Sequence, residues 1–399
     1  MTRLPFVLHD LQDSQIYALA QAAGRAGFEV VGTTNPEEPW VRRSKYVREA
    51  YAMPCLSDLT ASMYAYYLKQ TGLSGVWLPC TDDLAEFTAR YRGFLEKMGM
   101  RFLAPAPEAV ARVFAKEFPE VEGLVRPWGG EVRVASLYEE ASKLPYPLIL
   151  KAVRGHYRLI RDPEALVRVL DALQAREHPE ETLAIEAYVP GEVPRMASAI
   201  VLCDGEGRAV RGFTARRLRA AKAGDGLFGE TTAARAEWIP ELWEAAARLM
   251  EALGWRGFAE VECKQGPDGR WYLLEVNPRI SGWGVLAEAD GAGVLAAYHA
   301  LCAEGARLEP AVLQRSRARY VRVIATVYHD PDWAVPTEPQ DSLMRRARRL
   351  AQAVWAKLRD PAWVSLGAWD AWDLKASLWL LGRTIRRVWA LFRGRTRLD

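Results

Sequence analysis

Three polar side chains end an apolar run in the decapeptide WYLLEVNPRI, residues 271–280. They are Glu275, Asn277 and Arg279, spaced two residues apart. An acid, an amide and a guanidinium are an unusual end for such a strand, because an isolated buried carboxylate is strongly disfavoured. These groups must be solvated, paired with other side chains or bound to a cation, so they are the first candidates for chemistry in the chain.

A second acidic strand precedes this one. The run GFAEVECKQ carries Glu260 and Glu262 on one face, and the GPDG that follows is a strong turn signal, so the two runs predict a β-hairpin. Carboxylates brought together across a hairpin repel each other unless a cation neutralises them. Magnesium takes one or two protein carboxylates and completes its shell with water and phosphate oxygens. The hairpin therefore predicts a magnesium site, with a solvated acidic sheet edge as the alternative.

Strict alternation of side chains predicts two faces for the second strand of the hairpin. One face is expected to be pure core and holds Tyr272, Leu274 and Val276. The opposite face runs from apolar to polar and holds Trp271, Leu273, Glu275 and Asn277.

The stretch GFAEVECKQGPDGRWYLLEVNPR closely resembles the metal-binding hairpin of the ATP-grasp superfamily, in which an acid on the first strand precedes Glu-x-Asn-x-Arg. By that resemblance Glu262, Glu275 and Asn277 would hold Mg²⁺, or Mn²⁺ in its place, on the phosphates of ATP. Arg279 would neutralise a carboxylate or the acyl phosphate formed from it. Glu260 is the alternative ligand on the first strand.

Upstream segments supply the other parts that an ATP site needs. Lys151 ends the apolar strand YPLILK, where its ammonium could reach phosphate oxygens. The resemblance also assigns Lys116 to the nucleotide, although relatives carry Asp-Lys there and this chain has Ala115. For the nucleoside, the resemblance points to LAIEAYVPGE, with adenine at Glu186, Ala187 and Val189 and the ribose hydroxyls at Glu192.

Arg217 lies in GFTARRLRAAKAGDGLFGE, an arginine-rich strand before a glycine-rich loop that could close over a site as a lid. This stretch resembles a branch of predicted carboxylate-amine ligases that includes D-aspartate ligase. The resemblance assigns Arg217 to a phosphate or an acyl phosphate. A charged surface ribbon is the alternative.

The first hundred residues alternate short apolar runs with helical patterns, which predicts βαβ units and a parallel sheet. The first strand-to-helix turn, HDLQDSQ, has no glycine and so lacks the dinucleotide fingerprint. A substrate could still bind at the carboxyl ends of the strands, near His9, Asp10, Asp82 or Asp83. Polar loop and helix-cap residues are the alternative interpretation of these four side chains.

The combined patterns predict a multidomain protein of mixed α/β and α+β class. A Rossmann-like parallel-sheet domain at 1–112 precedes an ATP-grasp domain with antiparallel sheets at 113–310. The ATP-grasp domain is expected to divide into subdomains at about 113–189 and 190–310. A helical extension rich in Trp and Arg is predicted at 311–399.

Composition excludes several classes of protein. The net charge is only +3 over 399 residues, so we expect no nucleic-acid partner. The five cysteines lack CxxC spacing, which disfavours a disulfide framework and a zinc site and fits a reducing cytoplasm. No signal peptide is recognisable, and no segment approaches the about 18 apolar residues of a membrane span.

An amphipathic helix is predicted within 374–399, where leucines and other apolar residues form one stripe and arginines fill the remaining surface. Such a helix could lie on an anionic membrane surface at the inner face of the membrane. Packing on the protein's own core, or on the partner in a homodimer, is the alternative.

The resemblance implies an enzyme, an ATP-dependent carboxylate-amine ligase. ATP would phosphorylate a small carboxylate, and an amine would displace phosphate to give an amide or peptide bond, ADP and phosphate. At least one substrate is expected to be an amino acid or peptide. A carboxylase-like enzyme that activates bicarbonate is one alternative, and a nucleotide-binding module without turnover is another.

Overall fold

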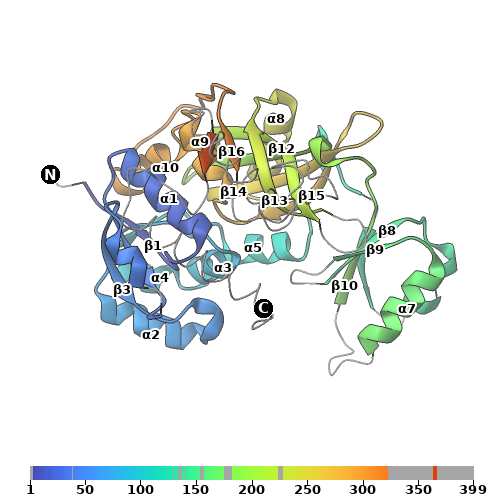
Figure 1. The fold of residues 1–399 in the computed structure, drawn as a ribbon, viewed down its shortest axis with the longest axis horizontal. Helices are drawn as coiled ribbons and strands as arrows, with labels where there is room; N and C mark the ends of the chain where they lie inside the picture. Colours follow the sequence, from blue (N-terminus) through green and yellow to red (C-terminus); the bar gives the residue numbers. More distant parts are fainter. Residues whose placement is uncertain are drawn as a thin grey trace, which may run out of the picture.

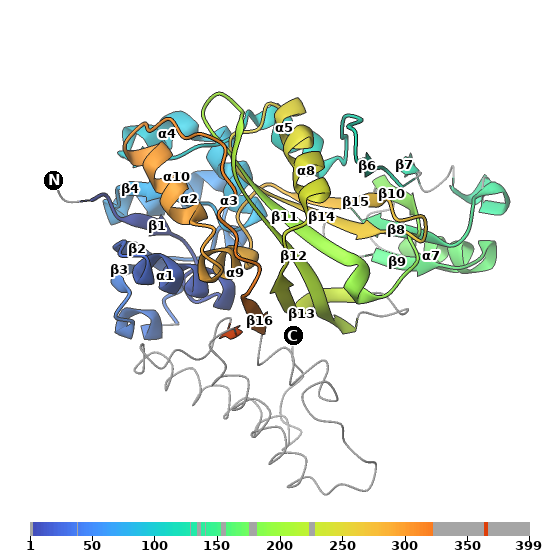
Figure 2. The same ribbon diagram turned by 90° about the horizontal axis from the view of Figure 1, so that it is seen from above.

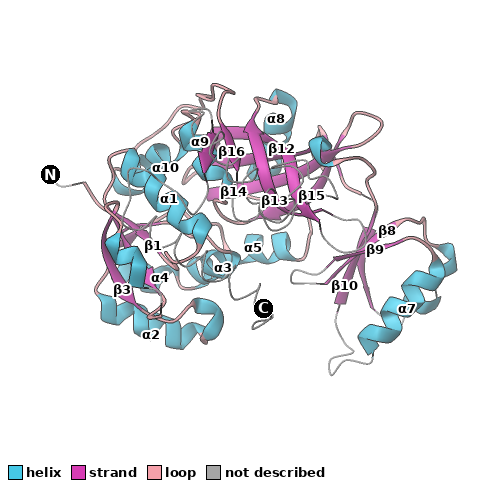
Figure 3. Cartoon of the chain, in the orientation of Figure 1, coloured by secondary structure: helices cyan, strands magenta, loops and turns pink. Residues whose placement is uncertain are grey.

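The computed structural model describes residues 3–37, 39–127, 129–133, 137–139, 141–152, 157–174, 182–222, 228–321 and 363–365. Within these residues the strands form three separate sheets, which run from the N-terminal domain on the left of Figure 1 to a small sheet on the right. Figure 3 shows helices beside each of the three sheets. The mixed class that the sequence predicts is confirmed.

The first sheet is parallel and has the strand order β3-β2-β1-β4-β5. Its strands are short and mostly apolar, and helices between them return the chain in the same direction, as the βαβ pattern predicts. The strands are β1 (Phe6–Leu8), β2 (Val30–Thr34), β3 (Val47–Ala52), β4 (Gly75–Trp77) and β5 (Met100–Arg101). The helices are α1 (Ser14–Arg25), α2 (Ala61–Thr71), α3 (Asp82–Arg90) and α4 (Arg92–Lys97), with 3-10 turns η1 (Pro39–Arg43) and η2 (Leu56–Asp58).

Strand order in this sheet reverses between β1 and β4, because the chain extends first to one side of β1 and then to the other. In open α/β sheets such a switch point leaves a crevice beyond the carboxyl ends of the two strands. The helices that follow these strands begin there. Asp13 caps α1 by accepting from the backbone N–H groups of Gln15 and Ile16, and Thr81 caps α3.

The second sheet is antiparallel, with the order β7-β10-β8-β9. The strands are β7 (Gly129–Arg133), β8 (Leu148–Ala152), β9 (Tyr157–Ile160) and β10 (Thr182–Ala187). Helix α7 (Pro163–Gln174) and the 3-10 turn η3 (Ala141–Lys143) accompany the sheet. Leu166 and Leu170, one helical turn apart on α7, bury themselves against Leu150 and Ile185 of the sheet. This small separate core holds β8 and β10 side by side.

The third sheet has eight strands in the order β17-β16-β13-β12-β11-β14-β15-β6. They are β6 (Leu124–Val125), β11 (Met196–Cys203), β12 (Ala209–Lys222), β13 (Phe228–Ala236), β14 (Gly257–Gln265), β15 (Trp271–Asn277), β16 (Arg319–Val321) and β17 (Trp363–Ser365). The helices of this part are α5 (Pro107–Phe114), α8 (Pro240–Ala252), α9 (Trp283–Ala289) and α10 (Val294–Ala303), with the 3-10 turn η4 (Val193–Arg195). The predicted hairpin of β14 and β15 is confirmed, and β11 and β12 form a second antiparallel hairpin.

The two faces of this sheet contribute to different cores. On β11, Ala199 and Val201 pack with α8 and α5, whereas Ile200 and Leu202 pack toward α9, α10 and the N-terminal sheet. Figure 2 shows α8 along one face and α9 and α10 between the sheet and the N-terminal domain. The large sheet therefore joins the parallel sheet through a continuous apolar core, which fixes the position of the switch point relative to β14 and β15.

The face prediction for β15 is wrong, because a β-bulge interrupts its alternation. Glu262 lies opposite Glu275, but the next pair is Cys263 with Leu273, so Leu274 is the extra residue. Val276 therefore joins Leu273 in the core, while Leu274 and Glu275 both line the opposite side. Bulges re-aim side chains in this way and are frequent beside active sites.

The chain returns to the large sheet through a clamp at Asp290, a buried residue just after α9. Its two carboxylate oxygens accept four backbone N–H groups, each at 2.7 Å, from the consecutive residues 315–318. Ser316 has a φ of 56°, which curls the backbone so that successive N–H groups converge on one anion. The clamp sets the direction in which β16 enters the sheet beside β13.

The predicted helix within 374–399, and most of the extension at 311–399, lie outside the described residues. No helix in the described part of the chain is both long and apolar enough to cross a membrane. The domain boundaries that the sequence suggests stay predictions.

Candidate active site

One cavity of about 820 Å³ lies where all three sheets meet. Its lining comes from the helix starts after β1 and β4, from β8 and β10, and from β14 and β15. Most of the residues singled out in the sequence line it, namely Lys116, Lys151, Glu186, Ala187, Val189, Arg217, Glu262, Glu275, Asn277 and Arg279. Glu192 does not belong to this lining; it is exposed at the start of η4.

The acidic hairpin forms one wall of the cavity. Glu262 lies opposite Glu275 in the register, and Glu260 lies opposite Asn277. The amide nitrogen of Asn277 donates to Glu260 at 3.2 Å and to Glu262 at 3.3 Å. Glu260 is only 2% exposed, and burial, followed by the charge of Glu262, raises the pKa of its carboxyl.

The donor set fits a hard cation that also takes ligands from a substrate. Among the described residues, no group of three or more His, Cys, Asp or Glu side chains converges on a point that could hold a metal alone. Magnesium does not need such a cage, because it usually keeps one or two carboxylates and completes its octahedron with water and phosphates. The Asn277 amide nitrogen already bonds to the glutamates, so its oxygen is the atom left to a cation.

Two lysines reach the acidic wall from the other side. Lys116 follows α5 with a φ of 56°, and its Nζ lies 3.2 Å from Oε1 of Glu275. Lys151 is the penultimate residue of β8, and its Nζ lies 2.6 Å from Oε2 of Glu186 on the neighbouring strand β10. Desolvation lowers the pKa of Lys151, and the Glu186 charge opposes that change.

The β-bulge also serves Lys151. Its Nζ donates to the backbone oxygen of Leu274 at 3.1 Å, and Leu274 is the extra residue of the bulge. A regular strand would place that residue in the ladder and turn its side chain with Val276. The bulge thus connects β15 of the large sheet to β8 of the small one at the centre of the cavity.

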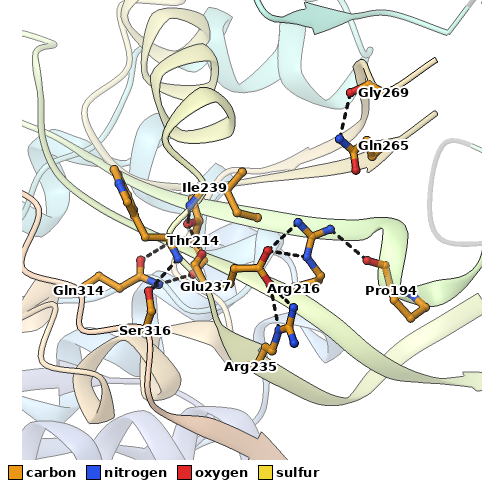
Figure 4. Close-up of polar contacts among 11 residues, drawn as sticks. Pro194, Thr214, Arg216, Arg235, Glu237, Ile239, Gln265, Gly269, Gln314 and Ser316 are labelled. Carbon is orange, nitrogen blue, oxygen red and sulfur yellow. Dashed lines mark hydrogen bonds and ion pairs between the residues drawn. The ribbon is translucent and has the colours of Figure 1, made fainter. Parts of the chain in front are cut away.

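Two neighbouring arginines of β12 have different surroundings. Arg217 is 6% exposed, lines the cavity and forms an ion pair with Glu262. Arg216 instead bonds Glu237 through Nε at 2.8 Å and the backbone oxygen of Pro194 through its NH1 nitrogen at 3.0 Å (Figure 4). Arg235 binds the same Glu237 carboxylate. Of the two, Arg217 is the one placed for chemistry, and Arg216 has a structural position.

Arg279 connects this wall to the N-terminal domain. Its Nε donates to Oδ1 of Asp82 at 2.8 Å, across 197 positions of sequence. Asp82 begins α3 at the switch point, and Asp83 lines the cavity beside it. Burial would lower the pKa of the guanidinium, but the charges of Asp82, Glu260 and Glu262, together with the hydrogen bond to Asp82, raise it above its ordinary value. One of the residues predicted at the carboxyl ends of the parallel strands, Asp82, therefore contacts the hairpin motif directly through Arg279.

His9 and Asp10, the other two candidates at the carboxyl ends, do not line the cavity. His9 is 1% exposed, lies against Trp77, and its Nδ1 is 2.6 Å from the Tyr64 hydroxyl. Burial lowers its pKa to about 3, so it stays neutral in the core. The alternative interpretation, in which these are ordinary structural residues, describes His9.

At the end of β10 the cavity is lined by Ala187, Tyr188 and Val189, together with Met196 of β11 and Lys264 of β14. We call this part of the cavity the slot. The sequence prediction missed Tyr188 and Lys264. Lys264 could have been found, because it follows Glu260 and Glu262 with the same spacing of two and therefore shares their face.

Comparisons with known proteins agree with this arrangement. Residues 119–311 match the family model "Carbamoyl-phosphate synthase L chain, ATP binding domain". The alpha subunit of mitochondrial methylcrotonoyl-CoA carboxylase from Rattus norvegicus is 26% identical over 228 residues, which are 54% of this chain. The chain spans only 28% of the length of that relative.

Solved structures show the same fold. The biotin carboxylase domain of 2-oxoglutarate carboxylase from Hydrogenobacter thermophilus, solved as a dimer with MgADP, ADP and bicarbonate, has a TM-score of 0.60 and 19% identity over 80% of this chain and 74% of that one. N5-carboxyaminoimidazole synthetase from Staphylococcus aureus has a TM-score of 0.52 and 15% identity over 78% and 80%. Residues 119–311 are therefore similar to the ATP-binding domain of that family, and the chain shares its fold with these solved enzymes.

Proposed function

We propose that the protein is an ATP-dependent ligase that activates a carboxylate as an acyl phosphate and joins it to an amine. The observation that carries this proposal is the convergence of the acidic hairpin, two lysines and Arg279 in one cavity at the switch point. A phosphate-binding end and an acid-binding end then lie within one enclosure, which the transfer of a phosphoryl group to a carboxylate requires.

The phosphates of ATP are assigned to Lys116 and Lys151. Both ammonium groups line the cavity, and both now pair with carboxylates that a bound nucleotide would replace. Glu262, Glu275 and the Asn277 oxygen would hold Mg²⁺, which when bound neutralises charge on the transferring phosphoryl group. Positioning and electrostatics account for most of the catalysis in such transfers.

The nucleoside is assigned to the slot after β10. The backbone of residues 186–189 offers hydrogen-bonding groups to the edge of adenine, and the side chains of Val189 and Met196 offer apolar contacts to its faces. Glu192, one turn further along the chain, is the proposed partner of the ribose hydroxyls.

The carboxylate is assigned to Arg279 and the amine to the space beside Asp82. Nε of Arg279 bonds Asp82, while the other guanidinium nitrogens are left to hold the carboxylate, the acyl phosphate and then the oxyanion formed when the amine attacks. Arg217, paired with Glu262, is the second cation for the transferred phosphate. An amino acid or peptide is the proposed amine or acid, as in the carboxylate-amine ligase branch that includes D-aspartate ligase.

Bicarbonate is the second candidate for the activated acid. It is favoured by the bicarbonate bound to the Hydrogenobacter domain and by the match to a carboxylase subunit. The two candidates share the nucleotide end of the cavity and differ only at Arg279. The dimer of that domain also makes a homodimer our expectation for this chain. Peripheral membrane binding through 374–399 stays a prediction.

Release of ADP from MgATP tests the proposal. The purified chain is incubated with pools of amino acids and small acids, with and without bicarbonate, and ADP is measured by a coupled assay. Turnover that needs both an acid and an amine supports the ligase, and turnover with bicarbonate alone supports the carboxylase-like enzyme. Tight binding of MgATP without turnover over the whole panel would favour a binding module, and no binding of MgATP would overturn the assignment.

A further inference from the structure

Lys264 is a buried cation at the nucleoside end of the cavity, and the chemistry described above does not use it. It lies on β14 in the row Glu260, Glu262, Lys264, whose members share one face of the strand. The residue is 4% exposed, yet it lines the cavity. At about 3.3 Å per residue, its Cα lies about 7 Å beyond that of Glu262. Along β14, the wall of the cavity therefore changes from acidic side chains at the metal site to a basic side chain at the slot.

The surroundings of Lys264 belong to the slot. Its Nζ lies 5.1 Å from the centre of the Tyr188 ring, and Tyr188 sits between Ala187 and Val189 on the segment assigned to adenine. Met196 is its neighbour in the register on β11. Glu192, the residue assigned to ribose, is the main charge that favours the ammonium form of Lys264.

An apolar side chain at this position would be enough to support the flat face of a purine. Pockets for small molecules are mainly apolar, and their few polar groups provide orientation and specificity. A lysine has three donors and no acceptor, so it recognises an acceptor atom of the ligand. Desolvating an ammonium is costly, and a hydrogen bond to a ligand acceptor offsets part of that cost.

We propose that Lys264 is a nucleoside-specificity residue, whose ammonium donates a hydrogen bond to an acceptor on the nucleoside half of the bound nucleotide. The acceptor is a ring nitrogen of the base or a hydroxyl oxygen of the ribose. This inference rests on the proposed function, because it needs the slot to hold the nucleoside. The lysines of the cavity then have two different roles: Lys116 and Lys151 bind phosphate, and Lys264 binds the nucleoside.

The test combines one substitution with a series of ligands. Binding of ATP, 1-deaza-ATP, 3-deaza-ATP, 7-deaza-ATP, 2′-deoxy-ATP, 3′-deoxy-ATP and tripolyphosphate, each with magnesium, is measured by calorimetry on the wild type and on Lys264→Met. A hydrogen bond to a charged donor predicts a loss of about 10- to 100-fold in ATP affinity for Lys264→Met. Tripolyphosphate has no nucleoside, and its affinity is expected to stay within about two-fold.

The analogue that lacks the true acceptor identifies it. The affinity of the wild type for this analogue should be about as low as the affinity of Lys264→Met for ATP. Lys264→Met itself should bind this analogue and ATP with about the same affinity. A deaza analogue that behaves in this way assigns the contact to the base, and a deoxy analogue assigns it to the ribose. Lys264→Gln, which keeps a donor, is expected to bind ATP with intermediate affinity.

Lys69→Met, an exposed lysine of α2 changed in the same way, is the matched control and should bind every ligand like the wild type. If the wild type binds all six nucleotides equally, or if Lys264→Met weakens tripolyphosphate binding as much as ATP binding, the inference is overturned. The wild-type series decides even if the variant does not fold. Failure of the wild type to bind any nucleotide would instead overturn the proposed function.

Discussion

The two ends of the cavity hold their cations in different ways. At the nucleotide end, Lys116 pairs with Glu275 and Arg217 pairs with Glu262, so these two cations proposed for phosphate contact carboxylates proposed for metal. The third, Lys151, pairs with Glu186 instead. At the switch-point end, Arg279 pairs with Asp82, which belongs to the N-terminal domain and is assigned to neither metal nor phosphate.

The difference predicts different behaviour on binding. A complex of magnesium and ATP brings a cation for the glutamates and phosphates for the basic side chains, so it can replace both members of each nucleotide-end pair at once. Magnesium alone would leave the basic side chain of each pair without a counter-charge, and ATP alone would leave the glutamate without one. The pair between Arg279 and Asp82 need not break, because it uses Nε and neither of the two terminal guanidinium nitrogens. Metal and nucleotide should therefore bind cooperatively, whereas Asp82 should act mainly on the chemical step.

The largest effect is expected from removing the metal ligands of the nucleotide end. Glu275→Ala combined with Asn277→Ala should lower ADP release by more than about 1,000-fold, because charge on the transferring phosphoryl group loses its counter-ion. Steady-state assays at saturating magnesium measure the loss. Glu244→Ala, an exposed glutamate of α8, is the control and should keep full activity. Normal turnover in the double variant would refute the metal assignment.

Withdrawal of magnesium tests the cooperativity directly. In EDTA, the affinity of the wild type for ATP should fall by about 100-fold, since the phosphates would then displace Lys116 and Arg217 from glutamates that gain nothing in return. Reciprocity requires ATP to tighten magnesium binding by the same factor. Calorimetric titrations in both orders measure the two factors, and independent binding of metal and nucleotide would contradict the exchange of partners.

Asp82 tests the other end of the cavity. Asp82→Asn should lower kcat by about 10- to 100-fold with the KM for ATP within about two-fold, because it loosens Arg279 without touching the nucleotide. Asp83→Asn, the adjacent acid on the same helix turn, is the matched control and should keep more of the activity. Equal losses in the two variants, or a loss confined to the KM for ATP, would contradict a positioning role for Asp82.

The smallest effect is a pH dependence of stability from Lys264. Burial lowers its pKa from 10.5 to about 8, whereas the unfolded chain keeps the ordinary value. Between these two pH values the unfolded state binds more protons, so the contribution of Lys264 to stability rises with pH and is lost as pH falls through 8. Urea unfolding of the wild type and Lys264→Met at pH 7.5, 9 and 10 measures it. A difference between the two proteins that is constant with pH would contradict the shift.

Sequence patterns predicted those features that depend on local spacing. The turn GPDG, the alternation of GFAEVECKQ and the βαβ order each rest on neighbouring residues, and the structure contains the predicted hairpin and the predicted parallel sheet. The resemblance to ATP-grasp proteins predicted that Lys151, Glu275 and Arg279 belong to one site, because each lies at a fixed offset from a strand end. All three line the same cavity.

Features that depend on long-range packing were beyond those patterns. At the bulge, Val276 packs in the core while the Leu274 carbonyl accepts a hydrogen bond from Lys151. Neither contact can be deduced from the sequence WYLLEVN. The contact of Asp82 with Arg279 joins residues that follow strands of two different sheets, so spacing could not select Asp82 from Asp10 or Asp83. Membrane binding through 374–399 lies outside the described residues.

The clamp at Asp290 has a consequence for the sheet margin. By holding residues 315–318, it delivers β16 to β13, and so covers backbone groups that would otherwise offer a template to another chain. Replacement of Asp290 by Ala would leave four backbone donors without their carboxylate and loosen that cover. Such a variant would lose solubility before it loses activity, because β13 strands of different molecules could pair with each other and the protein would precipitate.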